Sequence, residues 1–127
     1  MPKLLIIEEN NEMRRSLIGF LRRQSLDIDI FEAINGDDGM MKVTTVKPDV
    51  VIIDNDLSQI TCMGSVNQIK KLLPRCEIIV LTVFEKEVCR KIFRKAEISE
   101  FVNKHVMYDE LVSVLMRCVD HKAAVRG

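Results

Sequence analysis

The sequence lacks an excess of charge of either sign and lacks any long hydrophobic run. Lysine plus arginine and aspartate plus glutamate each total 19, so the formal net charge is zero and gives no general attraction to nucleic acid or anionic membrane. No apolar run approaches the roughly 20 residues of a membrane span. The first residues also lack the long apolar region of a signal peptide. We therefore expect a cytoplasmic chain with no membrane span and no direct contact with nucleic acid.

Paired cysteine motifs, repeats and linkers are also absent. No CxxC pair occurs, and neither histidine stands at ligand spacing from a cysteine. Scattered cysteines of this kind are typical of buried free thiols in a reducing compartment. The four are Cys62, Cys76, Cys89 and Cys118. A length of 127 residues suits one domain. We therefore predict a single domain over residues 1–127.

Short β-branched or aliphatic runs alternate with longer stretches that have helical spacing. The runs predict strands at residues 4–7, 28–31, 50–53, 78–81 and 101–102. A first helix is indicated by Met13, Leu17, Phe20 and Leu21, with Asn10 or Asn11 as its cap. Further helices are predicted at residues 40–46, 65–73, 85–95 and 108–121. The chain therefore alternates between strand and helix five times.

This alternation predicts an α/β fold of the three-layer, doubly wound (βα)5 type. Continuously apolar strands are typical of a parallel sheet covered on both faces, and the helices between them supply the right-handed crossovers. The run at 28–31, "IDIF", alternates between apolar and polar residues, which predicts an edge strand. The run at 50–53, "VVII", is wholly apolar and predicts a central strand.

Polar and charged residues follow the predicted strands at the point where each strand ends. They are Glu8 and Glu9 after the first strand, Asp54 and Asp56 after the third, Thr82 after the fourth, and Asn103 and Lys104 after the fifth. Ligands of open parallel sheets bind at the carboxyl ends of the strands, so these side chains should share one edge. Clustered carboxylates repel one another unless a proton or a cation lies among them.

The residue types at this edge suit phosphorylation of an aspartate. Carboxylate oxygens in a small cluster are suitable ligands for Mg²⁺. A lysine and a hydroxyl beside them would suit the oxygens of an incoming phosphoryl group. A carboxylate can act as the nucleophile and form an acyl phosphate, with the cations neutralising charge on the phosphoryl oxygens.

At this point the chain resembles a known family, the receiver domain of bacterial two-component response regulators, over essentially its full length. The matching segments are "LLIIEEN", "KPDVVIID", "EIIVLT" and "EFVNK". The resemblance implies a flavodoxin-like sheet in the order 2-1-3-4-5. It also implies that Glu8 and Glu9 form the acidic pair that helps to bind Mg²⁺, and that Asp54 accepts the phosphoryl group.

The resemblance assigns four further positions. Asp56 would offer its backbone carbonyl to the metal, Thr82 would contact the phosphoryl group, and Lys104 would pair with it. Phe101 falls on the aromatic switch position. Asp56 keeps a claim as the acceptor, since a glycine usually follows the acceptor by eight residues and Gly64 stands eight after Asp56 but ten after Asp54. We interpret this spacing as a loop two residues longer after Asp54.

Three functional hypotheses follow from these residues. In the first, a histidine kinase or phosphotransfer protein phosphorylates Asp54, and the face built from the fourth helix, fifth strand and fifth helix changes its binding to a partner protein, an output domain or a second copy. The domain would assist its own phosphotransfer and not act as an enzyme on another substrate. The chain is either a stand-alone receiver or a piece of a larger regulator.

The second hypothesis is a degenerate receiver that binds partners independently of phosphorylation. The glutamate at position 9, the altered loop and the bulk of Val83 beside Thr82 favour this alternative. The third is a flavodoxin-like cofactor binder, which would need a glycine- or serine-rich phosphate loop after the first strand. The segment "EENNEM" at that position is unfavourable to a bound phosphate.

Overall fold

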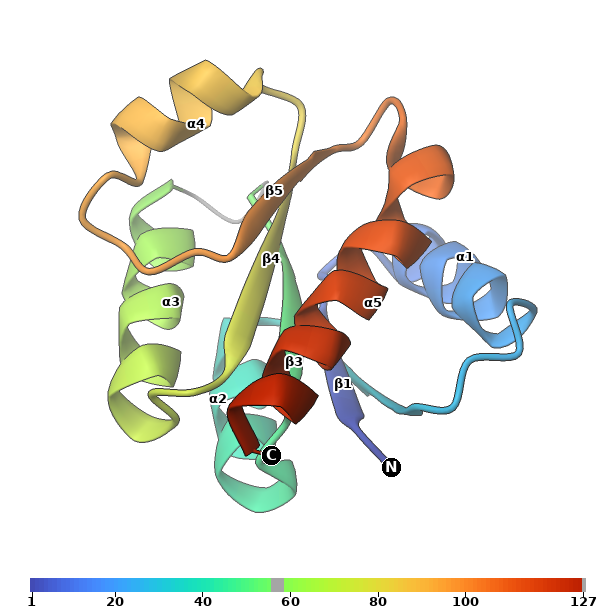
Figure 1. Ribbon diagram of the computed structural model, residues 1–127. Coiled ribbons are helices and arrows are strands. Elements are labelled where there is room, and N and C mark those ends of the chain that lie inside the picture. Colours follow the sequence, from blue (N-terminus) through green and yellow to red (C-terminus); the bar gives the residue numbers. More distant parts are fainter. Residues whose placement is uncertain (56–58, 127) are drawn as a thin grey trace.

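The chain folds into one parallel sheet with helices on both faces, as the computed structural model in Figure 1 shows. The structure describes residues 1–55 and 59–126, with side chains for all of these except 59–61 and 122–126. The strands are β1 (Lys3–Ile7), β2 (Asp29–Ala33), β3 (Val50–Asp54), β4 (Glu77–Thr82) and β5 (Glu100–Asn103). The helices are α1 (Asn11–Arg22), α2 (Gly36–Val46), α3 (Gln59–Leu72), α4 (Lys86–Ile92) and α5 (Met107–Arg126).

The strand order is β2-β1-β3-β4-β5 and all four pairings are parallel. The predicted doubly wound fold and its 2-1-3-4-5 order are therefore confirmed. The alternating run "IDIF" lies in the edge strand β2, whereas the wholly apolar run "VVII" lies in the central strand β3, where every residue is buried. A central strand has helices over both of its faces, so each of its side chains needs to be apolar until the strand ends.

Two separate hydrophobic clusters lie on the two faces of the sheet. One packs α1 and α5 against the sheet, with Leu17 and Leu111 at its centre. The other packs α2, α3 and α4 against the opposite face, with Val43, Ile69 and Cys89 among its members. Successive residues of a strand point to alternate faces, so the position of each residue decides which cluster it joins. The same alternation decides on which face a polar residue at the strand end will lie.

The predicted start of the third helix is wrong. We expected this helix to begin near residue 65, after a long loop, but α3 begins at Gln59 and includes Gly64. A glycine within a helix, such as Gly64, lowers the helical propensity. Cys62, Val66 and Ile69 are all buried at helical spacing, and their packing outweighs the local propensity. The loop two residues longer that we inferred after Asp54 falls on residues 56–58, outside the described residues.

The other predicted helices and strands are in the right places with shifted ends. The second helix starts earlier than predicted because the side chain of Asn35 accepts a hydrogen bond from Asp38 N–H at 2.8 Å and caps it. The fourth helix, α4, is shorter than the predicted 85–95, and α5 is longer than the predicted 108–121. The cap of α1 is Asn10, whose Oδ1 accepts a hydrogen bond from Met13 N–H at 2.9 Å.

The four cysteines are buried free thiols, as predicted. Burial raises the pKa of the Cys62 thiol to about 12 and that of Cys118 to about 11, so both remain protonated near neutral pH. They therefore behave as apolar core residues. Among the described residues, no helix combines the length and the apolar character that crossing a membrane requires.

Candidate functional site

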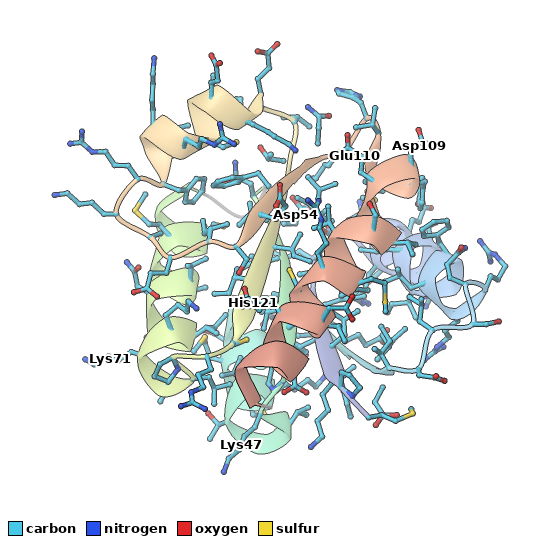
Figure 2. All side chains as sticks on the ribbon, in the orientation of Figure 1. Lys47, Asp54, Lys71, Asp109, Glu110 and His121 are labelled. Carbon is cyan, nitrogen blue, oxygen red and sulfur yellow. The ribbon has the colours of Figure 1, made fainter. Side chains whose placement is uncertain are left out.

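The carboxyl ends of β1, β3 and β5 bring Glu8, Asp54 and Lys104 together on one face of the sheet. Counted along their strands, all three positions alternate with residues of the α2–α3–α4 cluster and point to the side of α1 and α5. Figure 2 shows Asp54 toward the same end of the molecule as Asp109 and Glu110, away from Lys47 and His121. The predicted clustering of these side chains is therefore observed.

Asp54 and Lys104 form a close ion pair. The Lys104 Nζ lies 2.6 Å from the Asp54 Oδ1, and the Asp54 side chain is only 2% exposed. The backbone also fixes the two strand ends, since Lys104 N–H donates to Thr82 O at 2.8 Å and Asn55 N–H donates to Leu81 O at 2.8 Å. A buried charge pair of this kind requires good geometry, because both groups lose their contact with water.

Glu8 is a second buried carboxyl group beside Asp54. Burial raises the pKa of Glu8 from 4.5 to about 8, and the neighbouring Asp54 adds to this rise through a hydrogen bond and through charge repulsion. A hydrogen bond of 3.0 Å from Asn10 N–H to Glu8 Oε1 and the charge of Lys104 both act in the opposite direction. A single lysine therefore faces two carboxyl groups, and the pair favours either an extra proton or a cation.

Arg14 of α1 contacts the backbone of Glu8, although it was not among the predicted site residues. Its Nη1 donates to the backbone oxygen of Glu8 at 2.8 Å, and its Nη2 donates to Asn11 Oδ1 at 2.7 Å. The side chain is buried at 5% exposure. Arg14 stands with Leu17, Ile18 and Leu21 on the inward side of α1. A charged residue on an otherwise apolar helix stripe is the sequence signal that would have identified it.

Thr82 ends β4 on the opposite face of the sheet, toward α4. Its side chain is buried, and Oγ1 accepts hydrogen bonds from Phe84 N–H at 3.0 Å and from Asn55 Nδ2 at 3.4 Å. The Cys89 Sγ of α4 lies 3.6 Å from the same oxygen. Asn55 directly follows Asp54, so its hydrogen bond links the Thr82 hydroxyl to the end of the strand that carries the carboxylate. Neither Asn55 nor Cys89 was predicted to belong to the site.

Phe101 lies on the same face as Thr82, and its ring is buried. Its centroid is 5.7 Å from that of Phe93, which follows α4, with 43° between the ring planes. The aromatic residue of β5 therefore contacts the region around α4. This contact gives β5 and α4 a shared apolar surface behind Thr82.

Two predicted site residues, Glu9 and Asp56, are not part of the buried cluster that the structure describes. Glu9 is exposed, unlike Glu8, and Asp56 lies outside the described residues. Within residues 1–55 and 59–126, no cluster of three or more histidine, cysteine, aspartate or glutamate side chains could hold a metal ion. Mg²⁺ in proteins commonly uses one or two carboxylates and keeps several waters, so the adjacent carboxyl groups of Glu8 and Asp54 are a donor set that fits it.

The chain also matches a known family. The family model described as the response regulator receiver domain matches residues 4–116. The chain belongs to the receiver domain family.

Relatives of this receiver domain include larger proteins. The domain is 32% identical over 84 residues to a protein-glutamate methylesterase/protein-glutamine glutaminase of Methanosarcina mazei, covering 66% of this chain and 23% of that protein. It is 31% identical over 91 residues to the response regulator protein VraR of Staphylococcus aureus, covering 69% of this chain and 43% of that protein. The chain thus spans less than half the length of these relatives.

Solved receiver structures share the fold. A response regulator receiver domain from Clostridium thermocellum superposes with a TM-score of 0.86 at 20% identity, covering 98% of this chain and 99% of that chain. The chemotaxis protein CheY4 of Vibrio cholerae gives a TM-score of 0.82 at 18% identity, covering 93% and 98% respectively. At this level of identity the comparison supports the fold, and the site rests on the residues themselves.

Proposed function

We propose that this receiver domain accepts a phosphoryl group on Asp54 from a histidine kinase or a phosphotransfer protein. The observation that carries the proposal is the buried Asp54 carboxylate, held 2.6 Å from Lys104 Nζ with Glu8 beside it. Burial and a fixed cation orient one carboxylate at the edge of the sheet where ligands of this fold bind. Lys104 and Thr82 can contact the oxygens of the phosphoryl group.

The chemical step transfers the phosphoryl group from an oxygen or nitrogen atom of the donor to a carboxylate oxygen of Asp54. One carboxylate oxygen of Asp54 attacks the phosphorus atom, and the bond between phosphorus and the donor's leaving atom breaks. The leaving group keeps the bonding electron pair, and the product is an acyl phosphate on Asp54. Lys104 pairs with the developing charge of the phosphoryl oxygens, and Thr82 can donate its hydroxyl hydrogen to one of them.

Glu8 and Asp54 would hold Mg²⁺ through their carboxylate oxygens, and the backbone carbonyl of Asp56 remains a proposed third ligand. When bound, the ion would neutralise charge on the transferring phosphoryl group. The exposed side chain of Glu9 is available to orient the ion's waters. Arg14 donates a hydrogen bond to the backbone oxygen of Glu8 and so helps to position the residue that carries the first carboxylate.

Output would depend on the region around α4, β5 and α5. Thr82 and Phe101 both adjoin α4, so a movement of the hydroxyl toward Asp54 would change their packing. Exposed apolar side chains in this region support partner binding, namely Val83, Phe84, Val88, Val106 and Tyr108. The partner would be a downstream protein, an output domain or a second copy. The domain would act as a phosphoacceptor and not as an enzyme on a separate substrate.

The alternative of a degenerate, phosphorylation-independent binding module gains no support from the contacts of the site. A module without phosphorylation would not need a buried carboxylate pair with one lysine, since this cluster costs folding free energy. The buried Glu8, Asp54 and Lys104 therefore favour the phosphoacceptor.

Intact mass measurement of the whole chain after incubation with Mg²⁺ and acetyl phosphate tests the proposal. We expect one phosphoryl adduct, which is lost in Asp54→Ala and when a chelator removes the metal. Asp56→Ala serves as the matched control and should retain the adduct. Loss of the adduct in Asp56→Ala alone would move the acceptor to Asp56. Absence of any adduct, together with no Mg²⁺-dependent change in melting temperature, would favour the degenerate module.

A further inference from the structure

The hydroxyl group of Thr82 contacts three polar groups of the protein. Phe84 N–H and Asn55 Nδ2 both donate to Oγ1, at 3.0 and 3.4 Å. The Cys89 Sγ lies 3.6 Å from Oγ1 and 3.8 Å from the backbone oxygen of Phe84. Asn55, Thr82 and Cys89 are all buried, at 7%, 1% and 0% exposure, so the cluster makes its contacts within the protein.

The donor and acceptor inventory fixes the direction of the hydroxyl hydrogen. A threonine hydroxyl has two acceptor lone pairs and one hydrogen to donate. The amide groups of Phe84 and Asn55 take the two lone pairs. Cys89 Sγ is within donor reach of both Thr82 Oγ1 and the backbone oxygen of Phe84, but a thiol has only one hydrogen. With both lone pairs of Thr82 occupied, we assign the thiol hydrogen to Phe84 O and the hydroxyl hydrogen to the Cys89 sulfur. In this assignment Thr82, Cys89 and the backbone of Phe84 each have a partner, as buried polar groups require.

The cluster lies on the face of the sheet opposite to Asp54. The side chains of Asn55 and Thr82 point toward α3 and α4, whereas those of Asp54 and Lys104 point toward α1 and α5. Asn55 Nδ2 donates to Thr82 Oγ1 and thereby orients the amide, whereas Asn55 Oδ1 is buried and has no hydrogen-bond partner among the described residues. A hydroxyl hydrogen directed at Cys89 is unavailable to an acceptor at Asp54.

We propose that Cys89 and Asn55 are positioning residues that hold the Thr82 hydroxyl toward α4 and away from Asp54. This inference rests on the proposed phosphorylation of Asp54. A phosphoryl oxygen on Asp54 competes with the Cys89 sulfur for the same hydrogen. Sulfur is the weaker acceptor, so the contact can be broken by a charged oxygen. Because Cys89 belongs to α4, the release of Thr82 changes a contact of that helix directly.

The rotamer of Thr82 tests this assignment without any phosphoryl chemistry. Three-bond NMR couplings from the Thr82 methyl carbon to its backbone nitrogen and carbonyl carbon report the side-chain rotamer in the whole chain. We expect couplings of a single rotamer in the wild type and a shift toward averaged values in Cys89→Ala and Asn55→Ala. Cys89→Ser retains a polar partner and should restore the single rotamer. Cys118→Ala makes the same chemical change on the other face and should leave the couplings unchanged.

The rate of adduct formation with acetyl phosphate and Mg²⁺ gives the functional readout. Release of one hydrogen bond to Thr82 should make Cys89→Ala acquire the adduct about three- to tenfold faster than the wild type. The same substitution in a Thr82→Ala chain should change the rate less than about twofold, because the hydroxyl that it releases is missing. Cys89→Ser should react at a rate near that of the wild type.

The two readouts separate the inference from the proposed function. Unaveraged couplings in Cys89→Ala and Asn55→Ala would overturn the positioning role, as would an equal acceleration with and without the Thr82 hydroxyl. Absence of any adduct in the wild type would overturn phosphorylation, and the couplings would still decide whether Cys89 and Asn55 orient Thr82. Averaged couplings together with an acceleration that depends on Thr82 would support both.

Discussion

At the carboxyl edge of the sheet, the face under α1 and α5 carries charge, whereas the face under α2, α3 and α4 carries neutral polar groups. Glu8, Asp54 and Lys104 form the charged half, and Asn55 and Thr82 belong to the neutral half. Asp54 and Asn55 are consecutive, so one step along the chain separates the two halves. Strand alternation alone produces this division.

The two halves are stabilised in different ways. The charged half contains two carboxyl groups and one lysine, so its stability depends on protons and cations. The neutral half depends on geometry, because its groups exchange hydrogen bonds and bury no net charge. Under the proposed mechanism, a phosphoryl group on Asp54 would change the hydrogen bonds of Thr82 in the neutral half. Substitutions in the charged half should therefore change stability more than substitutions in the neutral half.

Removal of the lysine should have the largest effect. Lys104→Met leaves the buried carboxyl groups of Glu8 and Asp54 without their cation, so we expect the free energy of unfolding to fall by about 3 to 5 kcal/mol. Urea denaturation in metal-free buffer near neutral pH measures it. Lys86→Met is the matched control, since it removes an exposed pair with Glu100 and should cost less than about 1 kcal/mol. Equal losses in both variants would mean that the buried charges are already neutralised by other means.

The charged half should also make the protein less stable at higher pH. The pKa of Glu8 is raised in the folded state from 4.5 to about 8, so the folded chain holds a proton that the unfolded chain has lost. This contribution is fully present below about pH 4.5 and disappears as the pH rises through about 8. We expect a loss of roughly 2 to 3 kcal/mol across that window, below the full linkage value because the cluster relaxes around the charge.

Unfolding midpoints in chelator-containing buffers across this pH range measure the effect. Glu8→Gln cannot lose a proton and should remove the slope, and it should be more stable than the wild type at the upper end. Glu9→Gln alters the exposed neighbour and should retain the wild-type slope. A slope that persists in Glu8→Gln would assign the proton to another group of the cluster.

The charged half could be predicted from the sequence because strand ends are visible there. The apolar runs before Glu8, Asp54 and Lys104 fix where each strand stops, and parallel strands end at one edge. The neutral half could be predicted only in part. Thr82 ends a strand and was found, whereas Cys89 joins the site through the way α4 packs on the sheet. Such packing depends on contacts between distant segments, which one sequence does not display.

The start of α3 is a second feature that was predicted incorrectly from the sequence. The helix was predicted to begin near residue 65, but Cys62, Val66 and Ile69 lie at the spacing of a helix stripe that begins earlier. Similarly, Arg14 was not predicted as a site residue, yet it lies on the inward stripe of α1. In both cases the periodicity of the neighbouring apolar residues carried the better information.

Two glycines in the helices over the neutral face should give the smallest effects, and these should be of opposite sign. A Cβ at Gly39 in α2 would lie 2.6 Å from Ile7 Cδ1 and 3.0 Å from Ile7 Cγ1, and Ile7 is buried in β1. Gly39→Ala should therefore lower the free energy of unfolding by about 1 to 2 kcal/mol, because α2 must move away from the sheet or Ile7 must change its rotamer.

Gly64 in α3 is the matched control with the opposite sign. A Cβ there has no heavy atom of the described residues within 4 Å, so Gly64→Ala adds helical propensity without a clash. We expect it to raise the free energy of unfolding by about 0.5 to 1 kcal/mol. Urea denaturation of both variants in one buffer measures the pair. Stabilisation by both alanines would mean that α2 packs loosely on β1. The neutral half would then depend less on fixed geometry than the hydrogen bonds of Thr82 imply.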